Sequence, residues 1–268
     1  MLIESFLDYL RLERNYSERT IVSYQTDLRE FEGYLKKTES ELDWKKVHAD
    51  HVRNWMVHLM EDGKASTSVN RKLSSLRSFY RFLLRKKEVT VNPMLKVVGP
   101  KKKKPLPFFV REKDMNRLLD EIPFGEGFEG CRDRTILEVF YATGMRLSEL
   151  IGLNDVDVDF SAKLIKVTGK RNKQRLIPFG KELEENLNLY IKVRNEALPE
   201  REKSLFVRKN GMRMYPAQVY RLVRRSLSKV VTLKKRSPHV LRHTFATAML
   251  NDNAQLGAVK ELLGHESL

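Results

Sequence analysis

Hydrophobic residues recur at helical spacing in four successive stretches of the first 90 residues. Apolar side chains three and four positions apart share one face of an α-helix. The four sets run from Leu2 to Leu10, from Ile21 to Leu35, from Val52 to Leu59 and from Val69 to Leu84. Ser17 or Thr20 can cap the start of the second set, and Gly63 follows the third. The pattern therefore predicts four helices.

The pattern becomes mixed after Phe108. Alternating stretches, KLIKV at 163–167 and QRLIPF at 174–179, flank the turn sequence TGKRNK, which predicts a β-hairpin. A further short strand is predicted at 204–207. Helical spacing predicts helices in the remaining stretches, at 132–141, 181–194, 216–229, 238–250 and 255–263. We therefore expect a mainly α protein with a small β-sheet.

A stretch of linker composition separates these two regions. The sequence VVGPKKKKPLP contains Gly99, three prolines and four consecutive lysines, and Asn92-Pro93 has already ended the helical pattern. A chain of 268 residues suits about two domains. We predict a helical domain at 1–95, a basic linker at 96–107 and a second domain at 108–268.

The chain carries 51 Lys and Arg against 35 acidic residues, a net charge of +16. Such an excess favours a nucleic-acid partner, and the alternative is a solvated basic surface. The single cysteine, Cys131, excludes an internal disulfide and suits a reducing cytoplasm. No apolar run reaches the ~18 residues of a membrane span, and MLIESFLDYL lacks the basic residues of a signal peptide.

The positive charge is concentrated in the fourth predicted helix and the linker. Residues 1–63 have a net charge of −4, whereas residues 64–104 have +12. One arc of the helix holds only basic and small polar residues: Asn70, Arg71, Ser74, Arg77, Ser78, Arg81 and Arg85. A merely solvated face usually has mixed signs. We therefore predict phosphate contacts by Arg71, Lys72, Arg77, Arg81, Arg85, Lys101, Lys102, Lys103 and Lys104.

Three sites in the second domain hold candidate chemistry. In SPHVLRHTFAT, His239 and Arg242 share a helix face, and the guanidinium favours an anion over the zinc ion that two histidines four apart could bind. In ATGMRLSEL, Arg146 is either part of an anion site or a structural partner of Glu149. Lys170 stands at the predicted hairpin tip, where an ordinary exposed lysine is the local alternative.

Taken together, four motifs resemble the tyrosine recombinases of the λ-integrase and Xer type. These are TGMRLSEL, TGKRNKQRLIP, SPHVLRHTFAT and LLGHESL, in this order. The resemblance covers nearly the whole chain. It implies a SAM-like, four-helix core-binding domain followed by a mixed α/β catalytic domain. It also implies cutting and rejoining of duplex DNA through a 3′-phosphotyrosyl intermediate, without a cofactor or metal.

The resemblance assigns roles to five residues. Arg146 and Arg242 would clamp the scissile phosphate, and Lys170 would protonate the leaving 5′-oxygen. His239 would assist proton transfer, and His265 would hydrogen-bond a phosphate oxygen. His243 is outside the family's phosphate-contacting set, and we predict a structural core position for it. Breaking a phosphodiester requires such charge stabilisation and a leaving-group acid.

The family's nucleophile is a tyrosine roughly nine residues after the histidine of L-G-H, at about position 274. None of the nine tyrosines follows His265, so we expect a C-terminally truncated, inactive chain. A non-catalytic DNA-binding protein of the same fold is the alternative. The expected partners are duplex DNA with an inverted-repeat site and recombinase subunits in a homo- or hetero-tetramer. No membrane is involved, and the expected location is cytoplasmic, at a bacterial or archaeal nucleoid.

Overall fold

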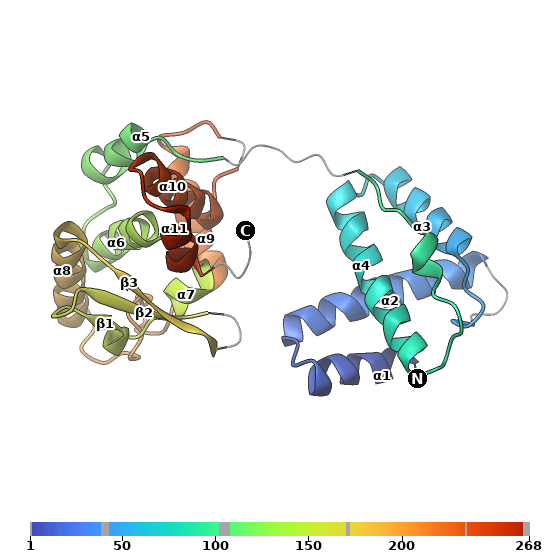
Figure 1. Cartoon of the computed structure of the whole chain (residues 1–268). Helices are drawn as coiled ribbons and strands as arrows, with labels where there is room; N and C mark the ends of the chain where they lie inside the picture. Colours follow the sequence, from blue (N-terminus) through green and yellow to red (C-terminus); the bar gives the residue numbers. More distant parts are fainter. Residues whose placement is uncertain (1, 39–42, 102–107, 170–171, 234, 265–268) are drawn as a thin grey trace. The chain divides into compact units, whose positions relative to one another are not determined.

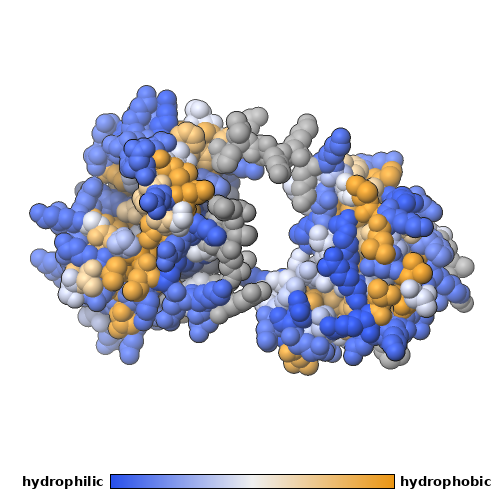
Figure 2. Space-filling model, viewed as in Figure 1, coloured by the Kyte–Doolittle hydropathy of each residue, from blue (hydrophilic) through white to orange (hydrophobic). Residues whose placement is uncertain are grey.

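The computed structural model describes residues 2–38, 43–101, 108–169, 172–233 and 235–264. The chain forms two compact units, Met1–Pro105 and Leu106–Leu268, each with its own apolar core. Figure 1 draws the two units with their elements labelled. Hydrophilic side chains cover most of the face of each unit that Figure 2 shows, with apolar patches between them.

Unit 1 is helical. Its segments are α1 (Leu2–Asp8), η1 (Tyr9–Glu13), α2 (Glu18–Thr38), α3 (Ala49–Glu61), α4 (Ser66–Arg85) and the short η2 (Pro93–Lys96). The predicted apolar faces meet in one core, in which Phe6, Phe31 and Trp55 are almost fully buried. Tight aromatic contacts join the helices, such as that between Phe31 and Trp55 with ring centroids 4.8 Å apart. The four predicted helices are confirmed, with the first continuing into η1.

Unit 2 surrounds the helix α6 (Gly127–Thr143). Its other helical segments are α5 (Glu112–Asn116), η3 (Arg117–Glu121), α7 (Leu147–Gly152), η4 (Asp155–Asp157), α8 (Lys181–Ala197), α9 (Pro216–Ser228), α10 (Pro238–Asn251) and α11 (Leu256–Leu263). Helix α6 is buried on most sides because α8, α10 and η3 all pack against it. This explains why its composition shows no strong polar face.

A small antiparallel sheet, in the order β1-β2-β3, lies at one side of unit 2 (Figure 1). Its strands are β1 (Val158–Asp159), β2 (Leu164–Thr168) and β3 (Gln174–Pro178). The predicted hairpin is confirmed, with Ile165 opposite Ile177 and Thr168 opposite Gln174. The strand predicted at 204–207 is wrong, because its ends form only isolated bridges, Ser204 with Asn154 and Val207 with Arg213. The mainly α fold with a small sheet is confirmed.

Candidate active site and nucleic-acid interface

Arg146 stands at the turn between α6 and α7. Helix α6 ends at Gly144, whose φ of +58° is left-handed and whose added Cβ would lie 2.4 Å from the Phe245 ring. Arg146 then takes the N-cap position of α7. The Glu149 carboxylate accepts hydrogen bonds from the Arg146 backbone N–H and from its Nη1, both at 2.7 Å. The predicted pairing of Arg146 with Glu149 is confirmed, and it fixes the guanidinium at this turn.

Arg242 reaches the same place from α10. It is 8% exposed, and its Nη1 donates to the Gly144 carbonyl oxygen at 2.7 Å. Its Nη2 donates to the carbonyl oxygen of Leu263, in the last turn of α11. Arg146 in turn donates through Nη2 to the Gly264 carbonyl oxygen at 2.9 Å. The two arginines, 96 positions apart in sequence, therefore converge on the loop after α6 and the end of α11.

A third arginine, Arg175 on β3, completes the group. Its Nη1 and Nη2 donate to the two carboxylate oxygens of Glu149, both at 2.9 Å, and its Nε donates to the Leu262 carbonyl oxygen at 2.7 Å. We did not predict this residue. A signal was present, because strand alternation puts Arg175 on the same face as buried Ile177, and a charge on a core-facing position requires a partner.

We call Arg146, Arg175, Arg242 and Glu149 the Glu149 cluster. Burial, together with the positive charges of Arg146 and Arg175 and against the opposing effect of Glu149, lowers the pKa of Arg242 to about 10. Burial alone would raise the pKa of Glu149, but hydrogen bonds from Arg175 and Arg146 hold it below its ordinary value. Two guanidinium groups thus bond to one carboxylate, while that of Arg242 is held beside them by the Gly144 and Leu263 carbonyl oxygens. The cluster therefore carries an excess positive charge that an anion would neutralise.

The predicted hairpin lysine and the last histidine cannot be compared with this geometry, since Lys170 and His265 lie outside the described residues. The residues that precede them, Gly169 and Gly264, lie close to the Glu149 cluster. A Cβ added to Gly169 would lie 3.4 Å from Oε1 of Glu149, and one added to Gly264 would lie 3.3 Å from Nη1 of Arg175. The backbone on either side of the Glu149 cluster therefore approaches it closely.

The two histidines of α10 are both exposed. The prediction that His243 is a core residue is wrong, because it falls on the solvent side of the helix, whereas Arg242 turns inward. Partial burial, followed by the positive charges of His239 and Arg242, lowers the pKa of His243. No group of three or more His, Cys, Asp or Glu side chains arranged to hold a metal ion occurs among the described residues.

Two of the predicted DNA contacts on α4 have partners inside unit 1. Arg71 binds both oxygens of Asp27 on α2, at 2.5 and 2.8 Å, and Lys72 is buried with its Nζ beside Asp27 and Glu30. We call these four residues the Asp27 cluster. Lys72 therefore does not present its ammonium group to solvent as the prediction requires. Its acidic partners were missed because they lie more than 40 positions away, on another helix.

The other predicted phosphate-binding residues differ in how far they are exposed to solvent. Arg77 is half-buried and donates to the Val97 carbonyl oxygen at 3.1 Å. Arg85 is exposed, but its guanidinium lies 4.1 Å from the centre of the Tyr9 ring and its Nη2 lies 3.6 Å from the Glu13 carboxylate. Arg81 is exposed and forms no hydrogen bond or ion pair within the part of the chain that the structure describes. Lys101 is exposed, and Lys102, Lys103 and Lys104 lie outside the described residues. Arg81 is thus the basic side chain of α4 that is most available to a ligand.

Both units match known protein families. Residues 109–268 match the Phage integrase family, and residues 3–87 match the Phage integrase, N-terminal SAM-like domain. The chain is 39% identical to the tyrosine recombinase XerC of Chlorobaculum parvum, over 99% of this chain and 87% of that one. It is also 39% identical to XerC of Pediococcus pentosaceus, over 100% and 90% of the two chains.

Solved structures have the same fold. A XerH site-specific recombinase bound to a palindromic difH substrate matches with a TM-score of 0.80 and 22% identity, over 99% of this chain and 78% of that one. The XerA recombinase matches with a TM-score of 0.54 and 25% identity, over 99% and 89%. The class is that of the site-specific DNA recombinases that use a tyrosine nucleophile. The chain belongs to the phage integrase family, with Xer-type tyrosine recombinases among its relatives.

Proposed function

We propose that unit 2 binds the scissile phosphate of duplex DNA at the Glu149 cluster and there prepares strand cleavage through a 3′-phosphotyrosyl link. The observation that carries this proposal is the convergence of Arg146 and Arg242, with Arg175, around a single carboxylate. Guanidinium groups bind phosphate oxygens in two bonds and remain charged at neutral pH. Fixed positive charge at this place stabilises the charge that develops on the non-bridging oxygens during cleavage.

The remaining roles follow the family resemblance. Lys170 protonates the leaving 5′-oxygen, His239 assists proton transfer, and His265 hydrogen-bonds a phosphate oxygen. The exposed position of His239, three residues before Arg242 on α10, supports a role at the surface where DNA would lie. Glu149 and Arg175 position Arg146 in this proposal, since both are bonded within the cluster and neither is needed for the chemistry itself.

We propose that residues 1–95 form the core DNA-binding domain, residues 96–107 a basic linker and residues 108–268 the catalytic domain. The family matches at 3–87 and 109–268 support this division. Arg81, Arg77, Arg85 and the lysines at 101–104 supply the non-specific phosphate contacts. Arg71 and Lys72 contribute through the packing of α4 on α2 instead.

The target we propose is an inverted-repeat DNA site on which recombinase subunits assemble as a homo- or hetero-tetramer. The palindromic substrate of the XerH complex supports a symmetric site. The physiological reaction is then chromosome dimer resolution or integration and excision of a mobile element. Both take place on DNA in the cytoplasm, at the nucleoid. No helix among the described residues has the length and apolarity that crossing a membrane requires.

We further propose that a polypeptide of residues 1–268 binds its site without cutting it. The nucleophile is expected at about position 274, and no tyrosine follows His265 in this sequence. Losing a nucleophile removes covalent catalysis, whereas the phosphate clamp needs only arginine and lysine.

The test begins by selecting a bound site from random duplexes, and then places a nick in that site to make a suicide substrate. Residues 1–268 should bind the duplex and form no covalent adduct. A version that continues past residue 268 and carries a tyrosine at about position 274 should form the adduct, and Tyr→Phe at that residue should abolish it. A covalent adduct from residues 1–268 alone would contradict the assignment of the nucleophile.

A further inference from the structure

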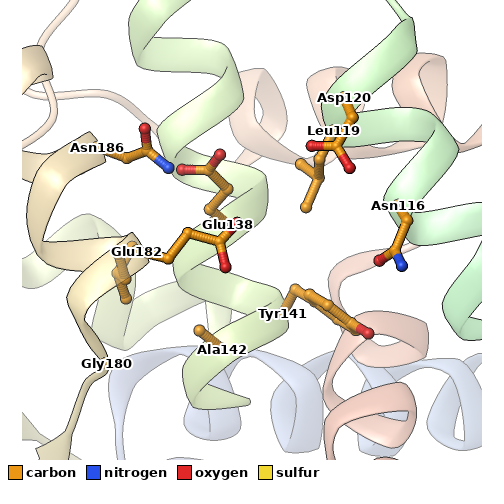
Figure 3. A pocket seen from close by; sticks show the side chains of 10 residues that line it. Asn116, Leu119, Asp120, Glu138, Tyr141, Ala142, Gly180, Glu182 and Asn186 are labelled. Carbon is orange, nitrogen blue, oxygen red and sulfur yellow. The ribbon is translucent and has the colours of Figure 1, made fainter.

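Unit 2 has a second polar cavity, distinct from the Glu149 cluster, between η3, α6 and the start of α8 (Figure 3). Its volume is about 180 Å³, far more than one water molecule occupies. Three carboxylates line it, those of Asp120, Glu138 and Glu182. Apolar contacts from Leu119, Ala142 and Leu183 complete the wall. The cavity therefore combines acidic and apolar groups, in a chain whose net charge is +16.

Glu138 is the unusual group in this wall. It is 6% exposed, and only one of its carboxylate oxygens is used: Oε1 accepts from Nε of Arg134 at 2.9 Å. The other oxygen, Oε2, is buried and has no hydrogen-bond partner among the described residues. A buried carboxylate oxygen without a donor costs free energy, so it usually marks the place of a missing proton, water or ligand.

The surroundings compensate the charge of this carboxylate only in part. Burial, with a smaller contribution from the negative charge of Glu182, raises the pKa of Glu138 to about 7. Arg134 and the Asn186 amide oppose it. Arg134 is also shared, because its Nη2 lies 3.9 Å from Asp120. Across the cavity from α8 stands Tyr141, whose pKa burial also raises. Arg134 thus lies near two carboxylates, those of Glu138 and Asp120. The third carboxylate of the cavity, that of Glu182, has no share in this arginine.

The missing group should be a cation with a short apolar stem. The three carboxylates of this cavity are not arranged to hold a metal ion, and no such arrangement occurs elsewhere in the described residues, so an organic cation fits better than a metal ion. An ammonium group can donate to Oε2 of Glu138 while its methylene chain packs against Leu119 and Leu183. We propose that this cavity binds a primary alkylammonium ion, with the ammonium at Glu138 and the alkyl chain along the apolar wall.

Such a ligand goes beyond the proposed function, since no residue of the cavity belongs to the Glu149 cluster. The same chemistry is available from a free diamine and from a lysine side chain of another protein. Binding requires the charged form of Glu138, whose pKa is about 7. The affinity should therefore rise as the pH rises through about 7, and binding below that pH should release the proton of Glu138.

The test uses ¹⁵N-labelled residues 1–268 at pH 8, titrated with cadaverine and followed by NMR. Resonances of the Asn186 side-chain amide and of the backbone at 138–142 should shift and saturate. Glu138→Gln, which keeps the shape of the side chain, should weaken binding at least about tenfold, because the hydrogen bond from the ammonium group loses its charged acceptor. Glu185→Gln removes an exposed carboxylate of α8 that does not line the cavity, and it should leave the affinity unchanged.

Two further arms complete the design. 1-Pentanol, which has no charge, should not saturate the same shifts, and cadaverine should bind more weakly at pH 6 than at pH 8. A lysine with blocked backbone ends tests the second source: comparable affinity would indicate a protein side chain, and weaker affinity a free diamine. Absence of saturable shifts with either amine at pH 8, or unchanged affinity of the Glu138→Gln protein, would overturn the proposal.

Discussion

Two clusters of basic side chains in this protein are built around a buried carboxylate, and they differ in charge. In the Asp27 cluster, Arg71 and Lys72 face Asp27 and Glu30, so the charges balance. In the Glu149 cluster, Arg146 and Arg175 bond to Glu149 and Arg242 lies beside them, so three arginines are grouped with one carboxylate. A balanced cluster is complete and holds two helices together. An unbalanced cluster lacks an anion, and it is there that we place the phosphate.

The largest expected effect concerns the balanced cluster. Asp27→Asn leaves the buried ammonium of Lys72 with too little countercharge, since Asp27 is fully buried and Lys72 nearly so. Removing one partner of a buried pair costs about 3–5 kcal/mol. We expect the free energy of unfolding of unit 1, measured by urea denaturation, to fall by about that amount.

Two control variants test whether the unpaired charge of Lys72 causes this loss of stability. Glu18→Gln removes the carboxylate of an exposed ion pair with Arg11, and it should have little effect. Adding Lys72→Met to Asp27→Asn should recover part of the loss, because the unpaired charge is removed as well. A stability loss that the second substitution deepens would mean that Lys72 is held by packing and not by its charge.

The next effect concerns the unbalanced cluster. Arg242→Ala in a chain that carries the tyrosine should reduce the rate of adduct formation about 10²–10³-fold, the usual result of losing one donor to a developing oxyanion. Arg71→Ala in the same chain should change this rate little, because its guanidinium is bonded to Asp27. Equal losses of rate in the two variants, at equal stability, would remove the distinction between the clusters.

A smaller effect separates the open basic residues of α4 from the paired ones. The double substitution Arg77→Glu and Arg81→Glu should weaken binding to any duplex, and it should lower the slope of log affinity against log salt by about two. Lys37→Glu on α2, outside the predicted basic arc, serves as a control. An unchanged salt slope in the double variant would exclude this face from the DNA interface.

The smallest effect is a pH dependence. The folded-state pKa of Glu149 lies below its ordinary value of 4.5, so its charge stabilises unit 2 above that pH. This stabilisation should be lost as the pH falls below 4.5, through the folded pKa. Thermal unfolding between pH 3 and 6 should show a slope that Glu149→Gln removes. A slope that remains in the variant would assign the acid sensitivity to other carboxylates.

Local patterns predicted much of this molecule. The longer helices of both units and the β2-β3 hairpin follow from periodicity, because burial of one face leaves a regular signature in the sequence, whereas the short segments α5 and η3 were not predicted. The pairing of Arg146 with Glu149 was also accessible, since three positions on a helix form one face. These contacts are all short in sequence.

The contacts that the sequence did not predict join residues far apart in the chain, or they depend on which face of a helix is buried. An acid-free arc on α4 appeared free to bind phosphate, yet Arg71 and Lys72 meet acids supplied by α2. Arg175 reaches the end of α11, 87 positions away. The prediction for His243 was wrong because the spacing of apolar residues in α10 does not distinguish the buried face of the helix from the exposed one.

The central claim is that the Glu149 cluster, with its excess positive charge, binds an anion and that the Asp27 cluster does not. The most direct measurement is a titration of ¹⁵N-arginine-labelled residues 1–268 with inorganic sulfate, following the guanidinium resonances. The side chains of Arg146 and Arg242 should shift together with one dissociation constant, while Arg71 stays unchanged. Shifts of equal size at Arg71, or none at Arg146 and Arg242, would contradict the account.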